Sequence, residues 1–244
     1  MMPRPAGRDP GPPEADASQP AGHGAAPRGC AVTAGTGGAV RARQNGAGRR
    51  PGSLRSFDPH RVADLEFRAW VGYYQRRWLR VLAASVLLVR DGFGMDWIRT
   101  LHGAWLVLRA NQLWAPFPDN DPARAQACMR RFYALIRLSY GKPDSPATAA
   151  ALEVGWWRAH REHQHAATAA GDDDAVADAL TRLYSYLYGE PESEVRAAAV
   201  HRAHAMDLSD RWLDEGRDPH SPLLAAEHAA LVRSYAALLA AVHH

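Results

Sequence analysis

The sequence predicts an all-α fold, a helical bundle of about seven to eight helices built from two similar four-helix halves. Three observations support this prediction. From Phe57 onward, apolar residues recur with the spacing of amphipathic helices. No stretch alternates between apolar and polar residues as a half-buried β-strand would. Four of the expected helices also begin with an Asp-Pro or Ser-Pro pair, at the same two places in each half.

Residues 1–56 form a tail that we expect to be disordered. Gly and Pro occur every few positions, aliphatic clusters are almost absent, and eight Arg against three acidic residues leave a net charge of +5. Such a segment cannot bury enough apolar area to offset the entropy of an ordered chain. The composition is also that of translated GC-rich DNA, so a true start nearer Val40 or Val62 is an open alternative.

Residues 57–244 are expected to form a single all-α domain, because every Trp, Tyr and Phe of the chain lies at or beyond Phe57. Gly, Pro and capping residues divide this part into helices. The region 59–91 is either one long helix or two abutting ones. The other expected helices are 95–114, 122–140, 146–167, 172–188, 191–215 and 222–242.

The two halves, residues 58–140 and 145–242, share more than their helix starts. The capping side chain accepts an orphan backbone N–H, and Pro occupies a position whose N–H needs no partner. We predict a duplication about a pseudo-twofold axis, while convergence on common helix-start chemistry stays open. The shared starts are Asp58-Pro59, Asp121-Pro122, Ser145-Pro146 and Ser221-Pro222. At identical spacing, Pro59, Ala63, Leu65, Glu66 and Trp70 recur as Pro146, Ala150, Leu152, Glu153 and Trp157.

The stretch from Trp105 to Tyr133, WLVLRANQLWAPFPDNDPARAQACMRRFY, resembles an uncharacterised family of all-α proteins from high-GC actinobacteria. The resemblance runs from about Phe57 to the C-terminus. It implies one ordered domain with a variable tail, and it implies no activity, cofactor or catalytic residue.

Composition narrows the class of protein. The formal charge of +3 less the +5 of the tail leaves −2 for the domain, so nucleic-acid binding by the domain is disfavoured. The longest apolar run, Val81 to Val89, is far shorter than the ~20 residues of a membrane-spanning helix, and no secretory signal is present. Cys30 and Cys128 form no disulfide or zinc pattern, so the cytoplasm is the expected compartment. A homodimer is left open.

Catalytic signatures are missing from the sequence. There is no P-loop, no dinucleotide-binding glycine motif and no nucleophile elbow. Di-iron bundles carry Glu-x-x-His twice, but here it occurs once, as Glu162 and His165, and Gln75 and Trp78 stand at the matching positions. No cofactor is evident, and these absences favour a protein that is not an enzyme.

Glu66 and Glu153 are the main candidates for a polar core. Each lies within an apolar, Trp-bearing stripe on the first helix of its half. An unpaired carboxylate there would cost several kcal/mol or shift its pKa, so each should have a partner. Arg131 and Arg233 are the expected partners, in a pairing that fixes helix register, and surface exposure is the alternative. Two matching tyrosines complete this candidate ligand-binding or polar-core set: Tyr133 and Tyr235.

A second interpretation is a metal site in the second half. His160 shares a helix face with Glu153, seven residues earlier. Two histidines three residues apart are neighbours on a helix, so an H-x-x-H pair could bind one transition metal. The alternative is a solvated histidine face, because the chain contains 12 His and such pairs arise by chance. The candidate ligands are Glu153, His160, His163, His201, His204 and Asp207.

These features lead to three function classes. The first is a binding or accessory module whose groove accepts a small apolar ligand or a partner helix. The alternative is a metal-dependent enzyme of oxygen or redox chemistry that uses Glu153 and the two histidine pairs. A DNA-binding regulator is the third, and the acidic domain argues against it. Five tryptophans are expected to anchor the core and not a cofactor: Trp70, Trp78, Trp97, Trp105 and Trp114.

Overall fold

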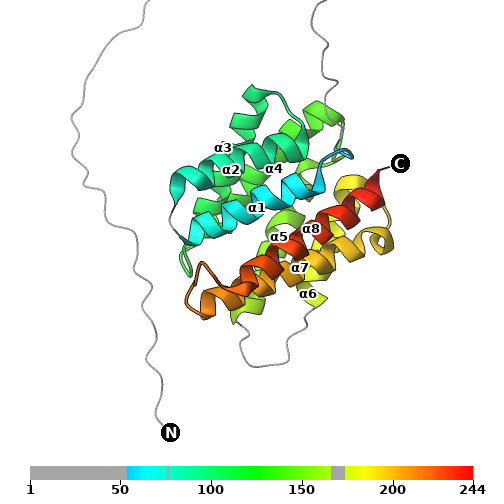
Figure 1. The fold of residues 1–244 in the computed structure, drawn as a ribbon. Helices are drawn as coiled ribbons and strands as arrows, with labels where there is room; N and C mark the ends of the chain where they lie inside the picture. The colour runs from blue at the N-terminus through cyan, green and yellow to red at the C-terminus, as the bar shows by residue number, and fades with distance from the viewer. Residues whose placement is uncertain (1–53, 76, 166–173, 244) are drawn as a thin grey trace, which may run out of the picture. The chain divides into compact units, whose positions relative to one another are not determined.

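The computed structural model describes residues 54–75, 77–165 and 174–243. These ranges contain eight α-helices and no β-strand, so the predicted all-α helical bundle is confirmed (Figure 1). The helices are α1 (Pro59–Tyr74), α2 (Trp78–Phe93), α3 (Trp97–Trp114), α4 (Pro122–Tyr140), α5 (Pro146–His165), α6 (Asp174–Tyr188), α7 (Glu192–Asp214) and α8 (Pro222–Val242).

The helix starts follow the capping residues read from the sequence. At all four Asp-Pro and Ser-Pro pairs, the Asp or Ser side chain accepts a hydrogen bond from a backbone N–H two or three residues later, at 2.9–3.2 Å. The region 59–91 is two helices and not one. The end of α1 packs closely on α2, because a Cβ added at Gly72 would lie 3.2 Å from Cγ2 of Val81.

Helix packing follows chain order and closes into a ring. Each helix packs on the next, and α8 returns to pack on α1, so that these two lie side by side (Figure 1). Exchanging α1–α4 with α5–α8 leaves this pattern unchanged, as a pseudo-twofold axis between two halves requires. The duplication itself stays a prediction, and superposition of residues 58–140 on 145–242 would test it.

Two apolar clusters hold the bundle together. The larger one draws on α2 to α8 and includes Trp156 and Trp157 of α5. The smaller one joins α1, α7 and α8 around Trp212, which is fully buried. The indole Nε1 of Trp212 donates a hydrogen bond to the carbonyl oxygen of Asp218 at 2.8 Å, so its polar atom is satisfied inside the core.

The packed part of the chain includes residues that were assigned to the tail from the sequence. Leu54, which the sequence analysis assigned to the tail, packs on the larger cluster. Arg55 forms an ion pair with Glu190 at 2.6 Å and donates a hydrogen bond to the carbonyl of Val242 at 3.0 Å. Residues 1–53 of the predicted tail lie outside the described residues. The segment Leu54–Arg55 therefore belongs to the domain.

The role predicted for the tryptophans is wrong at two positions. Trp97 and Trp105 are 53% and 56% exposed, and are not core anchors. They lie on the face of α3 opposite the buried Gly103 and Ala110. Of the other three, Trp70 and Trp114 are half-buried, and the side chain of Trp78 lies outside the described part.

One described helix, α8, is long and apolar enough by length and composition to cross a membrane. A third of its apolar window is buried within the protein, where α8 packs on α1 and α7. The helix also carries a buried glutamate, Glu227. Core helices can have the same hydropathy, so this single helix is weak evidence for a membrane span.

Candidate functional site

A buried ion pair joins the two halves of the bundle. Glu66 of α1 is only 4% exposed, as its place in an apolar stripe predicted. Its Oε1 lies 2.5 Å from Nη2 of Arg202 on α7, and its Oε2 accepts a hydrogen bond from the hydroxyl of Tyr235 on α8 at 2.5 Å. Both carboxylate oxygens are thus paired. The prediction that Glu66 is buried beside a cationic side chain is confirmed.

Arg202 is held from several sides. Its Nη1 donates hydrogen bonds to the hydroxyls of Tyr184 at 3.3 Å and Tyr235 at 3.2 Å, and its guanidinium lies 5.6 Å from the ring centre of Trp156. Burial alone would lower the pKa of Arg202, but the Glu66 carboxylate holds that pKa well above its ordinary value. Arg202 is therefore a fixed positive charge in the core.

Glu153, the matching residue of the second half, has a different partner. The hydroxyl of Tyr133 on α4 donates a hydrogen bond to its Oε2 at 2.7 Å. Burial raises the pKa of Glu153, while the Tyr133 hydrogen bond and the charge of Arg202 oppose this rise. The predicted direct contact with Arg or His is therefore wrong for Glu153, whose neighbour is a tyrosine.

The tyrosines are exchanged between the halves. Glu66 of the first half meets Tyr235 of the second, and Glu153 of the second half meets Tyr133 of the first. This exchange is what a twofold arrangement produces when α8 packs on α1 and α4 packs on α5. The predicted correspondence of the two Glu and the two Tyr fits the contacts.

The predicted arginine partners, Arg131 and Arg233, are wrong. Both are exposed. Each stands two residues before a tyrosine that points inward, and two residues turn a helix by about 200°, so the arginine points outward. The arginine that pairs with Glu66 is Arg202. Its signal in the sequence is its place among the buried Val195, Ala199 and Met206 of α7.

The histidine pairs reach different neighbours. Nε2 of His160 lies 3.0 Å from Oδ2 of Asp210, and His163 lies 3.4 Å from Asp207. Both contacts join α5 to α7. On α7 itself, His204 is exposed. The pKa of His201 is lowered mainly by burial, and the charges of Arg233 and His204 lower it further.

The six metal candidates are not gathered at one point. Glu153 bonds Tyr133, while His163 and Asp207 form a pair of their own. Among the described residues, no group of three or more His, Cys, Asp or Glu could hold a metal ion. In the part of the chain that the structure describes, these residues form separate His–Asp pairs and do not converge on one metal position.

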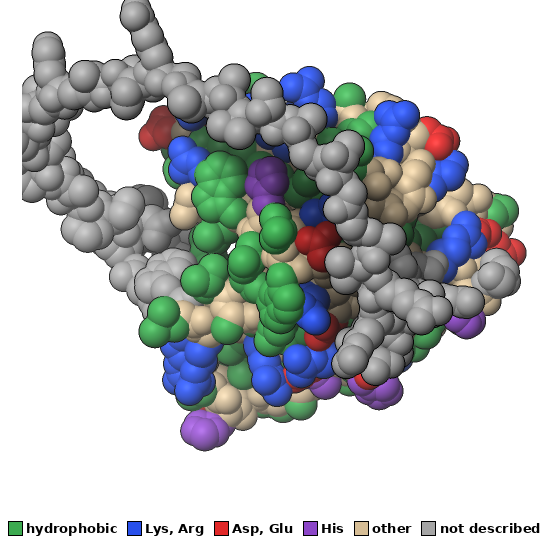
Figure 2. All heavy atoms as spheres, turned by 90° about the horizontal axis from the view of Figure 1, so that it is seen from above, with side chains coloured by type: hydrophobic (Ala, Val, Ile, Leu, Met, Phe, Trp, Pro, Cys, Tyr) green, Lys and Arg blue, Asp and Glu red, His purple; other side chains and the backbone are tan. Residues whose placement is uncertain are grey.

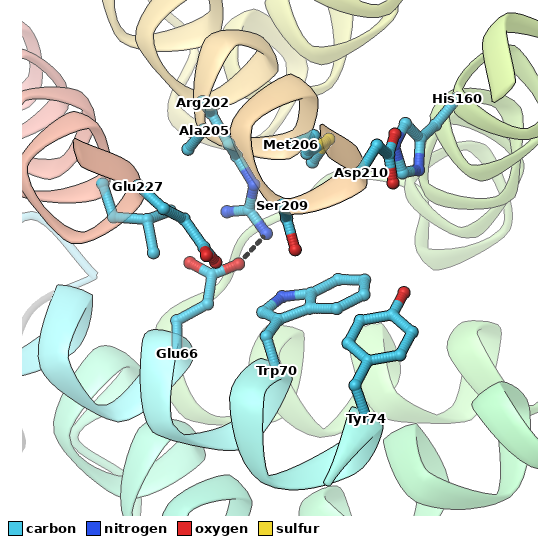
Figure 3. A pocket seen from close by; sticks show the side chains of 11 residues that line it. Glu66, Trp70, Tyr74, His160, Arg202, Ala205, Met206, Ser209, Asp210 and Glu227 are labelled. Atoms are coloured by element: carbon cyan, nitrogen blue, oxygen red, sulfur yellow. Dashed lines mark hydrogen bonds and ion pairs between the residues drawn. The ribbon is translucent and has the colours of Figure 1, made fainter. Parts of the chain in front are cut away.

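A narrow pocket opens beside the Glu66–Arg202 ion pair, between α1, α5, α7 and α8 (Figure 3). Its free volume is about 20 Å³, which is room for about one water molecule. Trp70 and Tyr74 lie on one side, with ring centres 6.0 Å apart and planes at 23°. The facing side carries Asp210 and His160. The pocket combines aromatic walls with several charged groups.

Two side chains of this pocket have a buried polar atom without a hydrogen-bond partner, Nε of Arg202 and Oε2 of Glu227 on α8. Glu227 is 2% exposed. Figure 3 shows its carboxyl group beside that of Glu66. Burial is the main cause that raises the pKa of Glu227 to about 8, and the negative charges of Glu66 and Asp210 contribute less. At neutral pH the group is therefore largely a neutral carboxylic acid.

Glu227 and Arg202 were not among the site residues predicted from the sequence. Glu227 has the same signal as Glu66, since it stands between the buried Leu223 and Leu231 on one face of α8. Both residues occur in one half only, so they are absent from the shared pattern that predicted Glu66 and Glu153.

Comparison with known proteins assigns no function. No family model matches the chain, and no curated protein or solved structure matches it either. The resemblance to an actinobacterial family stays a prediction.

Proposed function

We propose that this chain is a binding protein and that its pocket takes a small organic cation, the ammonium group of an amine. The observation that carries the proposal is Glu227, a buried carboxyl group whose Oε2 lacks a hydrogen-bond partner. An N–H donor of a bound ammonium would satisfy this oxygen and favour its ionised form.

The charges around the pocket support a cation. Three carboxyl groups, those of Glu66, Asp210 and Glu227, line it, against the guanidinium of Arg202 and the imidazole of His160. Arg202 is already paired with Glu66. Once Glu227 is ionised, the three carboxylates outnumber the cationic groups, so the ionised pocket attracts a cation.

The walls and size of the pocket restrict the ligand further. Trp70 and Tyr74 present aromatic rings, which attract cations through their negative faces. The free volume of about 20 Å³ accepts a head group and not a whole bulky ligand. The small apolar ligand expected from the sequence would leave Glu227 unsatisfied, so an amine is the better fit.

Calorimetric titration with methylammonium, using methanol as a neutral control of similar size, tests the proposal. We expect binding of methylammonium and none of methanol. Only ionised Glu227 pairs with the cation, so affinity should fall about tenfold per pH unit below pH 8 and level off above it. Each binding event below pH 8 should release a proton, which titrations in different buffers measure.

The variant Glu227→Gln keeps the shape of the side chain and removes its charge. We expect it to lose methylammonium binding, while Glu162→Gln on the exposed face of α5 keeps it. Equal binding of methylammonium and methanol, or unchanged binding by Glu227→Gln, would contradict an ammonium site.

A metal-dependent redox enzyme is the alternative that the sequence left open. The His160–Asp210 contact in the pocket wall is the observation nearest to it. Elemental analysis of the purified protein tests this alternative, and a stoichiometric transition metal lost in His160→Ala would favour it. The cytoplasm stays the expected compartment, and a homodimer can be tested by light scattering.

A further inference from the structure

The outer surface of α2 and α3 is apolar and exposed. Ile98 of α3 is 83% exposed and Leu79 of α2 is 85% exposed, which is unusual for large aliphatic side chains. Figure 2 shows hydrophobic side chains gathered on one face of the molecule. We call this surface the α2–α3 face, and its residues are Leu79, Leu82, Trp97, Ile98, Leu101 and Trp105.

The side chains of α3 cannot turn inward. Trp97, Leu101 and Trp105 are spaced four residues apart and form one stripe along the helix. The opposite side of α3 is filled: a Cβ added at Gly103 would lie 3.2 Å from the ring of Phe132. The close packing of α3 on α4 therefore holds this stripe at the surface.

The charge of the α2–α3 face is positive. Arg77 and Arg80 are exposed at the start of α2, and the guanidinium of Arg90 lies 3.8 Å over the ring of Trp97. The acidic residues of the two helices are already paired, Asp91 with Arg61 at 3.0 Å and Asp96 with Arg99 at 2.9 Å. The face thus offers exposed Trp and aliphatic groups next to unneutralised Arg.

We propose that the α2–α3 face binds the surface of an anionic lipid membrane. Trp favours the boundary between lipid head groups and acyl chains, aliphatic side chains enter the acyl region, and Arg meets the acidic head groups. The arrangement lies on the membrane and does not span it.

Other occupants fit the α2–α3 face less well. A second copy would bring two positive faces together, and the basic tail would do the same. A partner helix needs a groove, and the pocket described above includes no residue of α2 or α3. A flat bilayer needs no groove.

The second half supplies an internal contrast. If α2 and α3 are matched with α6 and α7, the only strongly exposed large apolar residue among the described part of that pair is Val200, at 42%. An exposed apolar helix pair is therefore specific to the first half, and Val200 offers a matched control position.

Co-sedimentation of the full chain with vesicles tests the proposal. We expect binding to vesicles of phosphatidylcholine with phosphatidylserine, little binding to phosphatidylcholine alone, and weakening by salt. Trp97→Gln and Trp105→Gln, both at exposed positions that should not disturb folding, should each reduce binding about tenfold. Val200→Gln should bind as the unchanged protein does, and circular dichroism confirms that all variants fold.

Several outcomes would overturn the proposal. Absence of binding to the acidic vesicles is the first. Full binding by the double variant Trp97→Gln/Trp105→Gln would assign vesicle binding to the basic tail instead. A dimer in solution that this double variant dissociates would assign the face to self-association. Equal loss in Val200→Gln would show that the effect is not specific to the α2–α3 face.

Discussion

Glu66 and Glu153 occupy matching positions in the two halves, yet their chemistry differs. Each bonds a tyrosine hydroxyl supplied by the other half. Only Glu66 also contacts a cation, Arg202, whereas burial raises the pKa of Glu153. The two glutamates thus share the tyrosine contact, while one additional arginine determines which of them forms an ion pair.

The pocket lies on the side of the bundle where the halves differ. If α3 and α7 are aligned through Trp114 and Trp212, Ala104 stands at the position of Arg202. Aligning α4 and α8 through Tyr133 and Tyr235 likewise places Ala125 opposite Glu227. Two small residues in one half thus correspond to two charged ones in the other.

The largest difference between the two glutamates should appear on truncation. Glu66→Ala leaves the buried guanidinium of Arg202 without its carboxylate, so we expect a loss of about 3–5 kcal/mol in the free energy of unfolding. For a domain of this size the melting temperature should fall by about 10 °C. Urea unfolding at pH 7 measures the loss.

The matched control for this truncation is Glu162→Ala, which removes an exposed glutamate from α5. It should change the free energy of unfolding by less than about 0.5 kcal/mol. A loss below about 1 kcal/mol for Glu66→Ala would mean that the ion pair contributes little and that the comparison of the two sites is wrong.

The next effect is a pH dependence caused by Glu227. Its pKa in the folded protein, about 8, is above the ordinary value of 4.5, so its stabilising contribution is complete below about pH 4.5 and is lost as the pH rises through about 8. Glu227→Gln cannot ionise. Its stability relative to the unchanged protein should therefore increase by about 3 kcal/mol between pH 5 and pH 8.

Thermal unfolding of both proteins at several pH values checks this prediction. Glu162→Gln serves as the control, because an exposed glutamate should give a difference that does not change with pH. A constant difference between Glu227→Gln and the unchanged protein would show that Glu227 is ionised in the fold and would remove the basis of the ammonium site.

The smallest effect should come from Glu153. Glu153→Ala leaves the buried hydroxyl of Tyr133 without its acceptor but strands no charged partner, so the expected loss is about 1–3 kcal/mol. Glu153→Gln keeps an acceptor and should lose about 1 kcal/mol or less. A greater loss for Glu153→Ala than for Glu66→Ala, measured in the same urea series, would reverse the order of the two sites.

Most of the fold could be predicted from the sequence because its helix ends are determined locally. An Asp or Ser before Pro caps a helix through its own side chain, and Gly141 and Gly189 follow helix ends with the positive φ that glycine adopts easily. These contacts span only a few residues. Arg55 was assigned to the tail because its partners, Glu190 and Val242, are distant in sequence.

The candidate site could be predicted only in part. An apolar stripe around Glu66 was enough to predict its burial. The choice of partner failed because Arg131 and Arg233 are adjacent to the correct tyrosines in sequence but face away from them. The exposure of Trp105 was missed because residue type alone does not show which side of α3 lacks a packed neighbour.

The ring of helices has a consequence for how the chain can be connected. Because α8 returns to α1, the two ends of the ordered domain touch: Arg55 donates to the carbonyl of Val242, and His243 contacts the carbonyl of Arg55 (Figure 1). A short linker from His243 to Leu54 would therefore allow new termini in the turn before Ser145. In this circular permutant the order of synthesis is α5 to α8 and then α1 to α4, while every helix keeps its neighbours. The helix order is therefore circular, and a chain that began at α1 or at α5 could form the same helix contacts.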